Sequence, residues 1–128
     1  MPTSKQEQML HAIRSDWELC SHQLGTSAPA QNVLEAMRRV PRDEFVPHEM
    51  RARAFDNNAL PIGEGQTISQ PFIVALMTDL LNLSTDHHVL EVGAGSGYQA
   101  AVLAELVSHV YTIEVVQSLA DGAATQLE

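Results

Sequence analysis

The sequence predicts an α/β fold built around one parallel β-α-β unit. An apolar run at 88–92 is followed by glycines at 93, 95 and 97 and by a helix-like segment at 98–107. A second strand-like run follows at 110–113. This order predicts a strand, a tight turn, a helix and a second strand. Two strands joined through a helix are expected to be parallel, with a right-handed crossover.

The residues before this unit predict two helices. Apolar side chains recur at steps of three and four over 4–24, which places them on one buried helix face: Leu10, Ile13, Trp17, Cys20 and Leu24. We interpret Trp17 as a core aromatic; the alternative is a residue that stacks on a cofactor. We interpret Cys20 as a small core residue. The turn at 25–29 ends this helix. A second helix is expected at 31–40, with Val33, Leu34, Met37 and Val40 inward and Pro41 closing it.

The middle of the chain alternates turn formers with apolar residues. We expect an extended or turn segment at 45–47 and one helical turn at 49–54. The glycine-rich and polar stretch at 60–71 predicts a surface loop of the kind that often carries function. Pro71 suits the first position of the next helix, with Ser69 or Gln70 near its cap. The expected buried face of that helix contains Phe72, Ile73, Leu76, Met77, Leu80 and Leu81.

Composition limits the classes of partner. The chain has 128 residues, which suits one domain, and its formal net charge of -9 would repel a nucleic acid backbone. Arginines gather at 38–53, but acids are interleaved among them, so we expect a mixed-charge surface and no nucleic acid partner. Cys20 is the single cysteine and the six histidines lack ligand spacing, so neither a disulfide nor a metal site is expected. With no apolar leader or membrane-length run, we expect a cytoplasmic protein without a membrane partner.

The glycine turn is a candidate ligand site. Glycine permits positive φ and lets a ligand lie against the main chain, while N–H groups of the first helical turn face it. The G-x-G-x-G spacing is not the dinucleotide fingerprint, and a bare turn without ligand is an equal alternative. Glu114 stands at the end of the second strand, where a carboxylate can accept both hydroxyls of a ribose; a solvated acid is the alternative. Together, loop and acid favour a ribose-containing cofactor.

Several segments together carry a family resemblance. They are Val33-Leu34-Glu35-Ala36-Met37, Val40-Pro41-Arg42, Phe45-Val46-Pro47, Leu60-Pro61-Ile62-Gly63, Gln66-Thr67-Ile68-Ser69-Gln70-Pro71 and the stretch 89–104. Over residues 33–127 the chain closely resembles the protein-L-isoaspartate O-methyltransferases. The Thr-Ile-Ser-Gln-Pro block is the more specific part, because other S-adenosylmethionine-dependent methyltransferases share the glycine loop and lack the block.

The resemblance implies a Rossmann-like methyltransferase fold, S-adenosyl-L-methionine as cofactor, and L-isoaspartyl residues of damaged proteins or peptides as substrate. The methylated α-carboxylate would then cyclise and reopen, which is protein repair. The implied cofactor-binding residues are Thr67, Glu91, Gly93, Gly95, Gly97 and Glu114. A carboxylate is already ionised at pH 7, so attack on the methyl group needs no general base. Ser69 is the implied catalytic residue, which would hold that carboxylate; a helix cap is its structural alternative.

The resemblance also implies that the fold is incomplete. We expect a single domain over 1–128, with an N-terminal helical and substrate-loop region at 1–82 and the start of the cofactor-binding β-α-β unit at 83–128. The family has a seven-stranded sheet, and this sequence supplies two strands. We therefore expect an unpaired sheet edge, an exposed apolar face and little turnover. A fragment, a truncated or diverged product, and a chain completed by a partner remain open.

Two other functions remain as alternatives. One is a non-catalytic module that self-associates through its open sheet edge. The other is a methyltransferase acting on a different acceptor, such as a small molecule or RNA. The Thr-Ile-Ser-Gln-Pro block and the net charge of -9 argue against the second.

Overall fold

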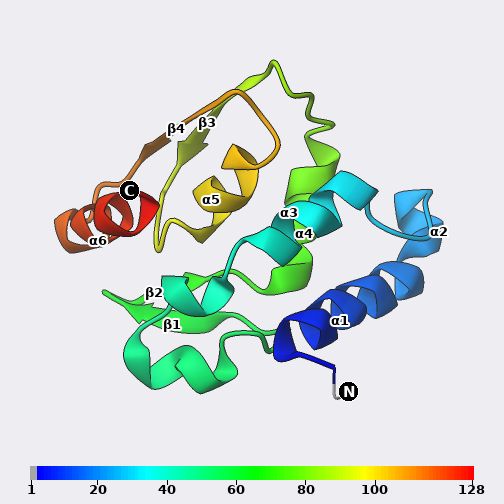
Figure 1. The fold of residues 1–128 in the computed structure, drawn as a ribbon, viewed down its shortest axis with the longest axis horizontal. Helices are drawn as coiled ribbons and strands as arrows, with labels where there is room; N and C mark the ends of the chain where they lie inside the picture. Colours follow the sequence, from blue (N-terminus) through cyan, green and yellow to red (C-terminus); the bar gives the residue numbers. More distant parts are fainter. Residues whose placement is uncertain (1–2) are drawn as a thin grey trace.

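The computed structural model describes residues 3–128, which form helices around two separate two-stranded sheets (Figure 1). The first part contains α1 (Lys5–Leu19), α2 (Ser21–Leu24), α3 (Gln31–Arg39), the 3-10 helices η1 (Arg42–Phe45) and η2 (His48–Arg53), strands β1 (Leu60–Gly63) and β2 (Gln66–Ile68), and α4 (Pro71–Leu80). The second part contains β3 (His88–Val92), α5 (Tyr98–Ala104), β4 (His109–Ile113) and α6 (Gln117–Leu127).

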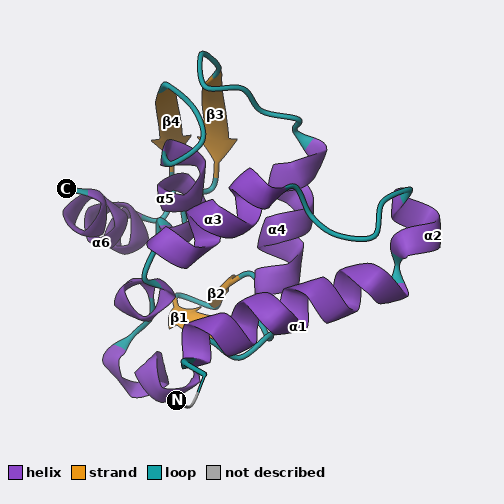
Figure 2. Cartoon of the chain, turned by 45° about the vertical axis from the view of Figure 1, so that its right-hand side comes forward, coloured by secondary structure: helices purple, strands orange, loops and turns teal. Residues whose placement is uncertain are grey.

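The predicted β-α-β unit is confirmed. β3 and β4 are parallel, with a register that runs from His88 opposite His109 to Val92 opposite Ile113. α5 ends at Ala104, three residues before the expected end of the helix. It lies between the β3–β4 sheet and the N-terminal helices, so one helix joins the two halves of the fold (Figures 1 and 2).

The N-terminal helices follow the predicted pattern with one break. The predicted single helix is divided at Cys20, where α1 ends and the short α2 begins. Cys20 is half-buried, so the expectation of a core cysteine is wrong. Trp17 is 1% exposed and lies in the core as predicted. Gly25 ends α2 in the left-handed conformation, with φ of 75°, as its position in the turn predicted.

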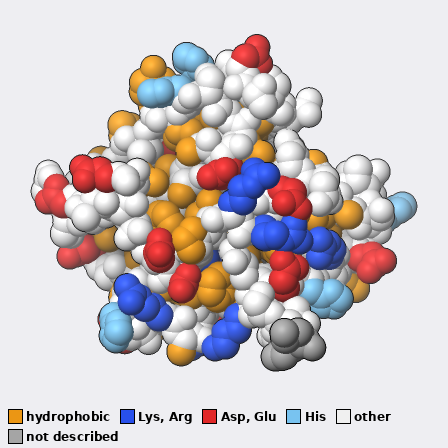
Figure 3. Space-filling view, in the orientation of Figure 1, with side chains coloured by type: hydrophobic (Ala, Val, Ile, Leu, Met, Phe, Trp, Pro, Cys, Tyr) orange, Lys and Arg blue, Asp and Glu red, His pale blue; other side chains and the backbone are white. Residues whose placement is uncertain are grey.

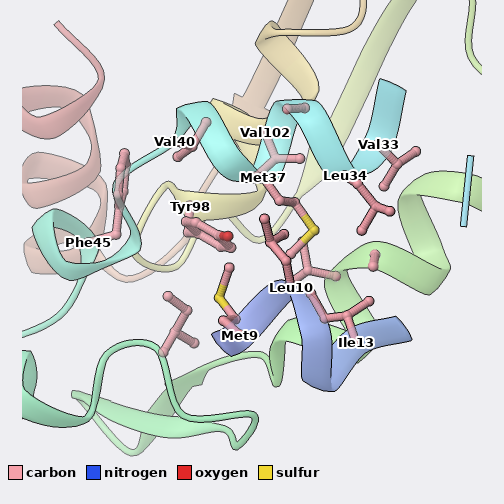
Figure 4. Close-up of a cluster of buried hydrophobic side chains, with 14 of the residues drawn as sticks. Met9, Leu10, Ile13, Val33, Leu34, Met37, Val40, Phe45, Tyr98 and Val102 are labelled. Carbon is pink, nitrogen blue, oxygen red and sulfur yellow. The ribbon is translucent and has the colours of Figure 1, made fainter. Parts of the chain in front are cut away.

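The hydrophobic core draws side chains from both parts of the chain (Figure 4). α1 contributes Met9, Leu10 and Ile13, α3 contributes Val33, Leu34 and Met37, and α5 contributes Tyr98 and Val102. Each large apolar side chain buried in this way stabilises the fold by about 1.5–3 kcal/mol. The glycine turn, which precedes Tyr98, is therefore held by the same core as the N-terminal helices.

The predicted surface loop at 60–71 is in fact a β-hairpin followed directly by a helix. β1 pairs antiparallel with β2, and Leu60 lies opposite Ile68 with both side chains buried. Glu64 and Gly65 join the strands, with φ values of 57° and 69°. Positive φ at both central residues matches the right-handed twist of a two-residue hairpin. The glycines that suggested an irregular loop serve this turn.

Helix α4 exposes part of the face that the sequence pattern assigned to the core. Pro71 occupies its first turn and Gln70 its N-cap, as expected. Its buried residues are Pro71, Val74, Ala75 and Thr78. Met77 is 60% exposed, so its interpretation as core filler is wrong, and Leu80 and Leu81 are exposed too. α1 and α3 cover only one side of α4, which leaves this apolar stripe facing outward.

One face of the β3–β4 sheet is also apolar and exposed, as expected from a sheet of two strands. α5 covers the other face. The exposed side chains are Leu90, Val92, Tyr111, Ile113 and, just beyond β4, Val115. Val115 is 97% exposed. We call these five residues the open sheet face. Large exposed apolar patches are a common feature of interaction sites.

Charged side chains mix on the surface shown in Figure 3, where Lys and Arg have Asp and Glu beside them. Arg38, for example, bonds both Glu7 and Glu35. The arginine-rich segment is thus largely a mixed-charge surface, as predicted, with Arg42 as a buried exception. Within residues 3–128, no helix combines the length and apolarity needed to cross a bilayer.

Candidate active site

A cleft of about 450 Å³ lies between the β1–β2 hairpin, α4, β3 and the start of α5. It brings together five of the predicted site residues from distant parts of the chain: Thr67, Ser69, Glu91, Gly93 and Gly95. The other two, Gly97 and Glu114, do not line it. Segments 67–69 and 93–96 therefore face one space.

The glycine turn adopts a backbone that other residues rarely take. Gly93, Gly95 and Gly97 have φ values of 93°, 55° and 91°. The N–H groups of Gly93 and Ala94 donate to the carbonyl oxygen of Ile113 at 2.8 and 3.0 Å, which ties the turn to the end of β4. A Cβ added at Gly93 would have no atom within 4 Å. The main chain at Gly93 thus faces open space that a ligand can fill.

Glu114 braces the glycine turn. Its carboxylate accepts hydrogen bonds from the N–H groups of Gly95 at 2.7 Å and Val116 at 3.1 Å. The N–H of Gly95 is therefore not free for a ligand. Each carboxylate oxygen has further acceptor capacity, so the pair of ribose hydroxyls that Glu114 was predicted to bind remains chemically compatible.

These hydrogen bonds make the turn sensitive to acid. The bonds from Val116 and Gly95 hold the pKa of Glu114 below its ordinary value, against the opposing effect of burial. A lowered folded-state pKa stabilises the fold above the unfolded pKa of about 4.3, and this stabilisation is lost as pH falls through the lower folded value.

We expect the amide resonance of Gly95 to titrate with that lowered pKa in an NMR pH series. Glu114→Gln should abolish the titration, while the amide of Gly25, outside this turn, should not follow it. A Gly95 midpoint at or above about 4.3 would contradict the bracing role.

Glu91 faces the α5 side of the sheet and borders the cleft. Its carboxylate accepts a hydrogen bond from Oγ1 of Thr112 at 2.6 Å. Burial raises the pKa of Glu91, the Thr112 bond opposes this, and the nearby Glu114 raises it further. Glu91 is thus a partly desolvated acid in the wall of the cleft.

The segment at 67–69 lies across the cleft from the glycine turn. Thr67 belongs to β2, Ser69 follows the strand, and both are exposed. α4 begins at the next residues without a side-chain cap. The cap role considered for Ser69 is therefore not seen, and its hydroxyl stays available on the cleft wall. The carbonyl oxygen of Ser69 accepts a hydrogen bond from Nη2 of Arg42 at 2.8 Å.

Other lining residues were not predicted as site residues. They are mainly apolar or small and include Met77 of α4, Leu81 just after it, Ser96, and Gln99 of α5. Nε2 of Gln99 donates to Oγ1 of the buried Thr78 at 2.9 Å and so links α5 to α4. The sequence feature that could have predicted Met77 and Leu81 as lining residues is the apolar stripe at 72–81, which is too wide for a single packing interface. Within residues 3–128, no Lys, Arg or His lines the cleft.

Comparisons with known proteins agree on one family. Residues 18–128 match the family described as Protein-L-isoaspartate(D-aspartate) O-methyltransferase. The chain is 54% identical over 120 residues to protein-L-isoaspartate O-methyltransferase 2 of Syntrophobacter fumaroxidans, covering 94% of this chain and 49% of that protein. It is 61% identical over 95 residues to the protein-L-isoaspartate O-methyltransferase of Opitutus terrae, covering 74% of this chain and 41% of that protein. The chain thus spans about half the length of these curated relatives.

Two solved structures show the same fold. One is described as a protein-L-isoaspartate O-methyltransferase, with a TM-score of 0.71 and 24% identity over 89% of this chain and 38% of that one. The other is a Plasmodium falciparum protein of the same description, in complex with S-adenosyl-L-homocysteine. It has a TM-score of 0.67 and 22% identity, and the match covers 90% of this chain and 54% of that one. The predicted Rossmann-like methyltransferase fold, present in part, is confirmed.

Proposed function

The chain belongs to the protein-L-isoaspartate(D-aspartate) O-methyltransferase family, and from that premise we propose that it takes part in methyl transfer from S-adenosyl-L-methionine to L-isoaspartyl residues of damaged proteins. The acceptor atom is an oxygen of the α-carboxylate, and the biological role is protein repair. Within this proposal the region at 1–82 supplies the acceptor side and the region at 83–128 the cofactor side.

The observation that carries the proposal is the shared cleft. Ser69 and Thr67 border it from one side and the glycine turn borders it from the other. The open space over Gly93 suits a ligand that lies against the main chain. To the cofactor we assign Glu91, Gly93, Gly95, Gly97 and Glu114 from the region at 83–128, and Thr67 from the opposite wall of the cleft. Gly97 is buried and outside the cleft, so its contribution is to shape the turn.

S-adenosyl-L-methionine, when bound, supplies a methyl group on a positively charged sulfur. The chain's own residues orient and desolvate the acceptor. An α-carboxylate is already ionised at pH 7, so the reaction needs no general base. The lining, which within residues 3–128 contains no Lys, Arg or His, is compatible with such a reaction. The Ser69 hydroxyl donates a hydrogen bond to the carboxylate, and the apolar side chains of α4 exclude water.

Gly93→Ala is expected to weaken binding of S-adenosyl-L-homocysteine by at least tenfold in calorimetric titration, because the added methyl group would occupy the open space over the turn. Gly25→Ala is the matched control: its φ of 75° resembles the 93° of Gly93, and neither Cβ would meet an atom within 4 Å. Equal losses in both variants would show that backbone strain, and not the cleft, explains the effect.

Methyl transfer itself is tested with labelled S-adenosyl-L-methionine and two peptides that differ only in an isoaspartyl or an aspartyl residue. We expect label in the isoaspartyl peptide, at a low rate. Ser69→Ala should reduce the rate about 10- to 100-fold, since a hydrogen bond to a charged group contributes about 1.5–3 kcal/mol. Ser15→Ala, on the exposed side of α1, should have no effect. Equal labelling of both peptides would overturn the substrate assignment.

The open sheet face favours a second candidate function, a module that assembles with another copy of itself. Val92 and Ile113 are paired across the two strands and are 76% and 54% exposed. If assembly is the function, light scattering should show a concentration-dependent dimer that Val92→Lys with Ile113→Lys abolishes. Glu18→Lys, which adds a lysine on α1, is the control. A monomer at all concentrations excludes this candidate.

A further inference from the structure

A buried arginine connects the two sides of the cleft. Arg42 belongs to η1 and is 0% exposed. Its Nε donates to the carbonyl oxygen of Ala54 at 2.7 Å, and its Nη2 donates to that of Ser69 at 2.8 Å. A longer bond, at 3.4 Å, joins Nη2 to the carbonyl oxygen of Asn58. The guanidinium thus holds the main chain at the proposed acceptor residue.

The same guanidinium lies over the ring of Tyr98, with 4.9 Å between its central carbon and the ring centroid. Tyr98 is the first residue of α5, directly after Gly97, and it borders the cleft. Phe45 holds the ring from another direction, in an edge contact at 5.8 Å. Tyrosine is neutral at pH 7, and burial raises the pKa of Tyr98 further, to about 12, so the face of a neutral ring attracts the cation.

Stability alone is a poor explanation for a charge at this position. Among residues 3–128, the ion pairs of arginine involve Arg38, Arg39 and Arg53, and Arg42 has no carboxylate partner. Nη1 of Arg42 and the hydroxyl of Tyr98 are buried without a hydrogen-bond partner in that part of the chain. Unsatisfied buried polar groups cost about 1–3 kcal/mol each, and packed apolar side chains often replace buried charges without loss.

The geometry of the guanidinium group better explains why an arginine stands at position 42. A guanidinium is a planar fork with five donors, so it can bond carbonyl oxygens at its rim while its face lies on an aromatic ring. Lysine has one compact charged group and cannot hold all of these partners in one plane. The contacts of Arg42 therefore define a direction and a distance between Ser69 and Tyr98.

We propose that Arg42 is a positioning residue that sets the separation between the acceptor segment at Ser69 and the cofactor turn that ends at Tyr98. Its effect on catalysis rests on the proposed function. In-line transfer requires the reacting atoms about 3–3.5 Å apart, and a displacement of 1 Å can cost about 100-fold in rate. Arg42 reaches neither reactant; it acts through Ser69 and Tyr98.

Hydrogen exchange measured by mass spectrometry tests this without requiring activity. In Arg42→Lys we expect exchange to rise at least tenfold at 66–70 and at 93–98 together, with α1 unchanged. Arg39→Lys is the control, because Arg39 is exposed and its nearest acid, Glu105, is 3.8 Å away. A rise in only one segment, or a uniform rise that includes α1, would overturn the positioning role. Arg42→Met removes all the carbonyl bonds, and if it does not fold, the Lys variant decides the question.

Kinetics give the second readout. With the isoaspartyl peptide, Arg42→Lys should lower kcat by at least tenfold and change KM less than threefold, because misplacement affects the reacting geometry more than peptide binding. A change confined to KM would overturn the proposal. If the unsubstituted chain neither binds S-adenosyl-L-homocysteine nor transfers label, the proposed function fails, while the exchange experiment still decides the role of Arg42.

Discussion

Gly97→Val is expected to lower the free energy of unfolding by about 3 kcal/mol. Gly97 has a φ of 91°, and a side chain with a branched Cβ is strained in that conformation by about 1–2 kcal/mol or more. The new Cβ would also stand 3.4 Å from Cβ of Ala123 and from two carbon atoms of Leu127. The Cβ alone would be in ordinary contact, but the two γ-methyl groups of valine extend beyond it, and overpacking of this kind adds about 1–3 kcal/mol. Urea unfolding, followed by circular dichroism, measures the change.

Gly122→Val is the matched control, since Gly122 lies within α6 with ordinary backbone geometry and no atom within 4 Å of an added Cβ. Its effect should stay within about 0.5 kcal/mol. If both variants lose equal stability, then close packing of the turn on α6 does not explain the glycine at 97. A stable Gly97→Val protein would show that the turn tolerates another backbone conformation.

Trp17→Ala is expected to cost about 3–5 kcal/mol, a large part of the stability of a domain of this size. Trp17 is 1% exposed, its Nε1 donates to Oγ1 of Thr26 at 3.1 Å, and its ring meets that of Phe72 edge-on at 6.1 Å. Phe72 belongs to α4, so the loss of this contact should also loosen a wall of the cleft. Urea unfolding gives the energy, and titration with S-adenosyl-L-homocysteine gives the consequence for binding.

Leu19→Ala provides the comparison on the same helix, because Leu19 is 83% exposed. We expect a change of less than about 0.5 kcal/mol. If Leu19→Ala and Trp17→Ala have similar effects, Trp17 does not anchor α1 to α4. If Trp17→Ala loses stability but retains full affinity, the wall of the cleft does not depend on that anchor.

The periodic elements of the fold were predictable because each has a local signal. Steps of three and four marked Leu10, Ile13 and Trp17 as one helix face, and the glycines at 93–97 marked the turn between β3 and α5. The β1–β2 hairpin was missed, because its strands are only four and three residues long and Glu64 is unusual at positive φ. A sequence pattern shows which side chains lie on the apolar face of a helix, but it does not show whether another element covers that face. Met77, which was predicted to be buried and is exposed, is an example.

The site was predictable in residue type and only partly in arrangement. Thr67 and Ser69 meet Gly93 and Gly95 across one cleft, which only the folded chain shows. The contact between Glu114 and Gly95 depends on the exact ends of two strands, and sequence spacing does not give it. Arg42 lay in a segment that resembles the family, yet no local pattern distinguishes a buried arginine from its exposed neighbours. Its role depends on partners 12 to 56 positions away in sequence.

The shared core has a consequence for synthesis on the ribosome. Val102 and Leu106 pack in one cluster with Leu10 and Leu34, so this cluster lacks part of its packing until about residue 106 has left the exit tunnel. Until then the part of this cluster that α5 covers stays exposed. Nascent chains in that state are prone to aggregation. Chaperone binding to ribosome-attached chains should therefore decline only after α5 has emerged.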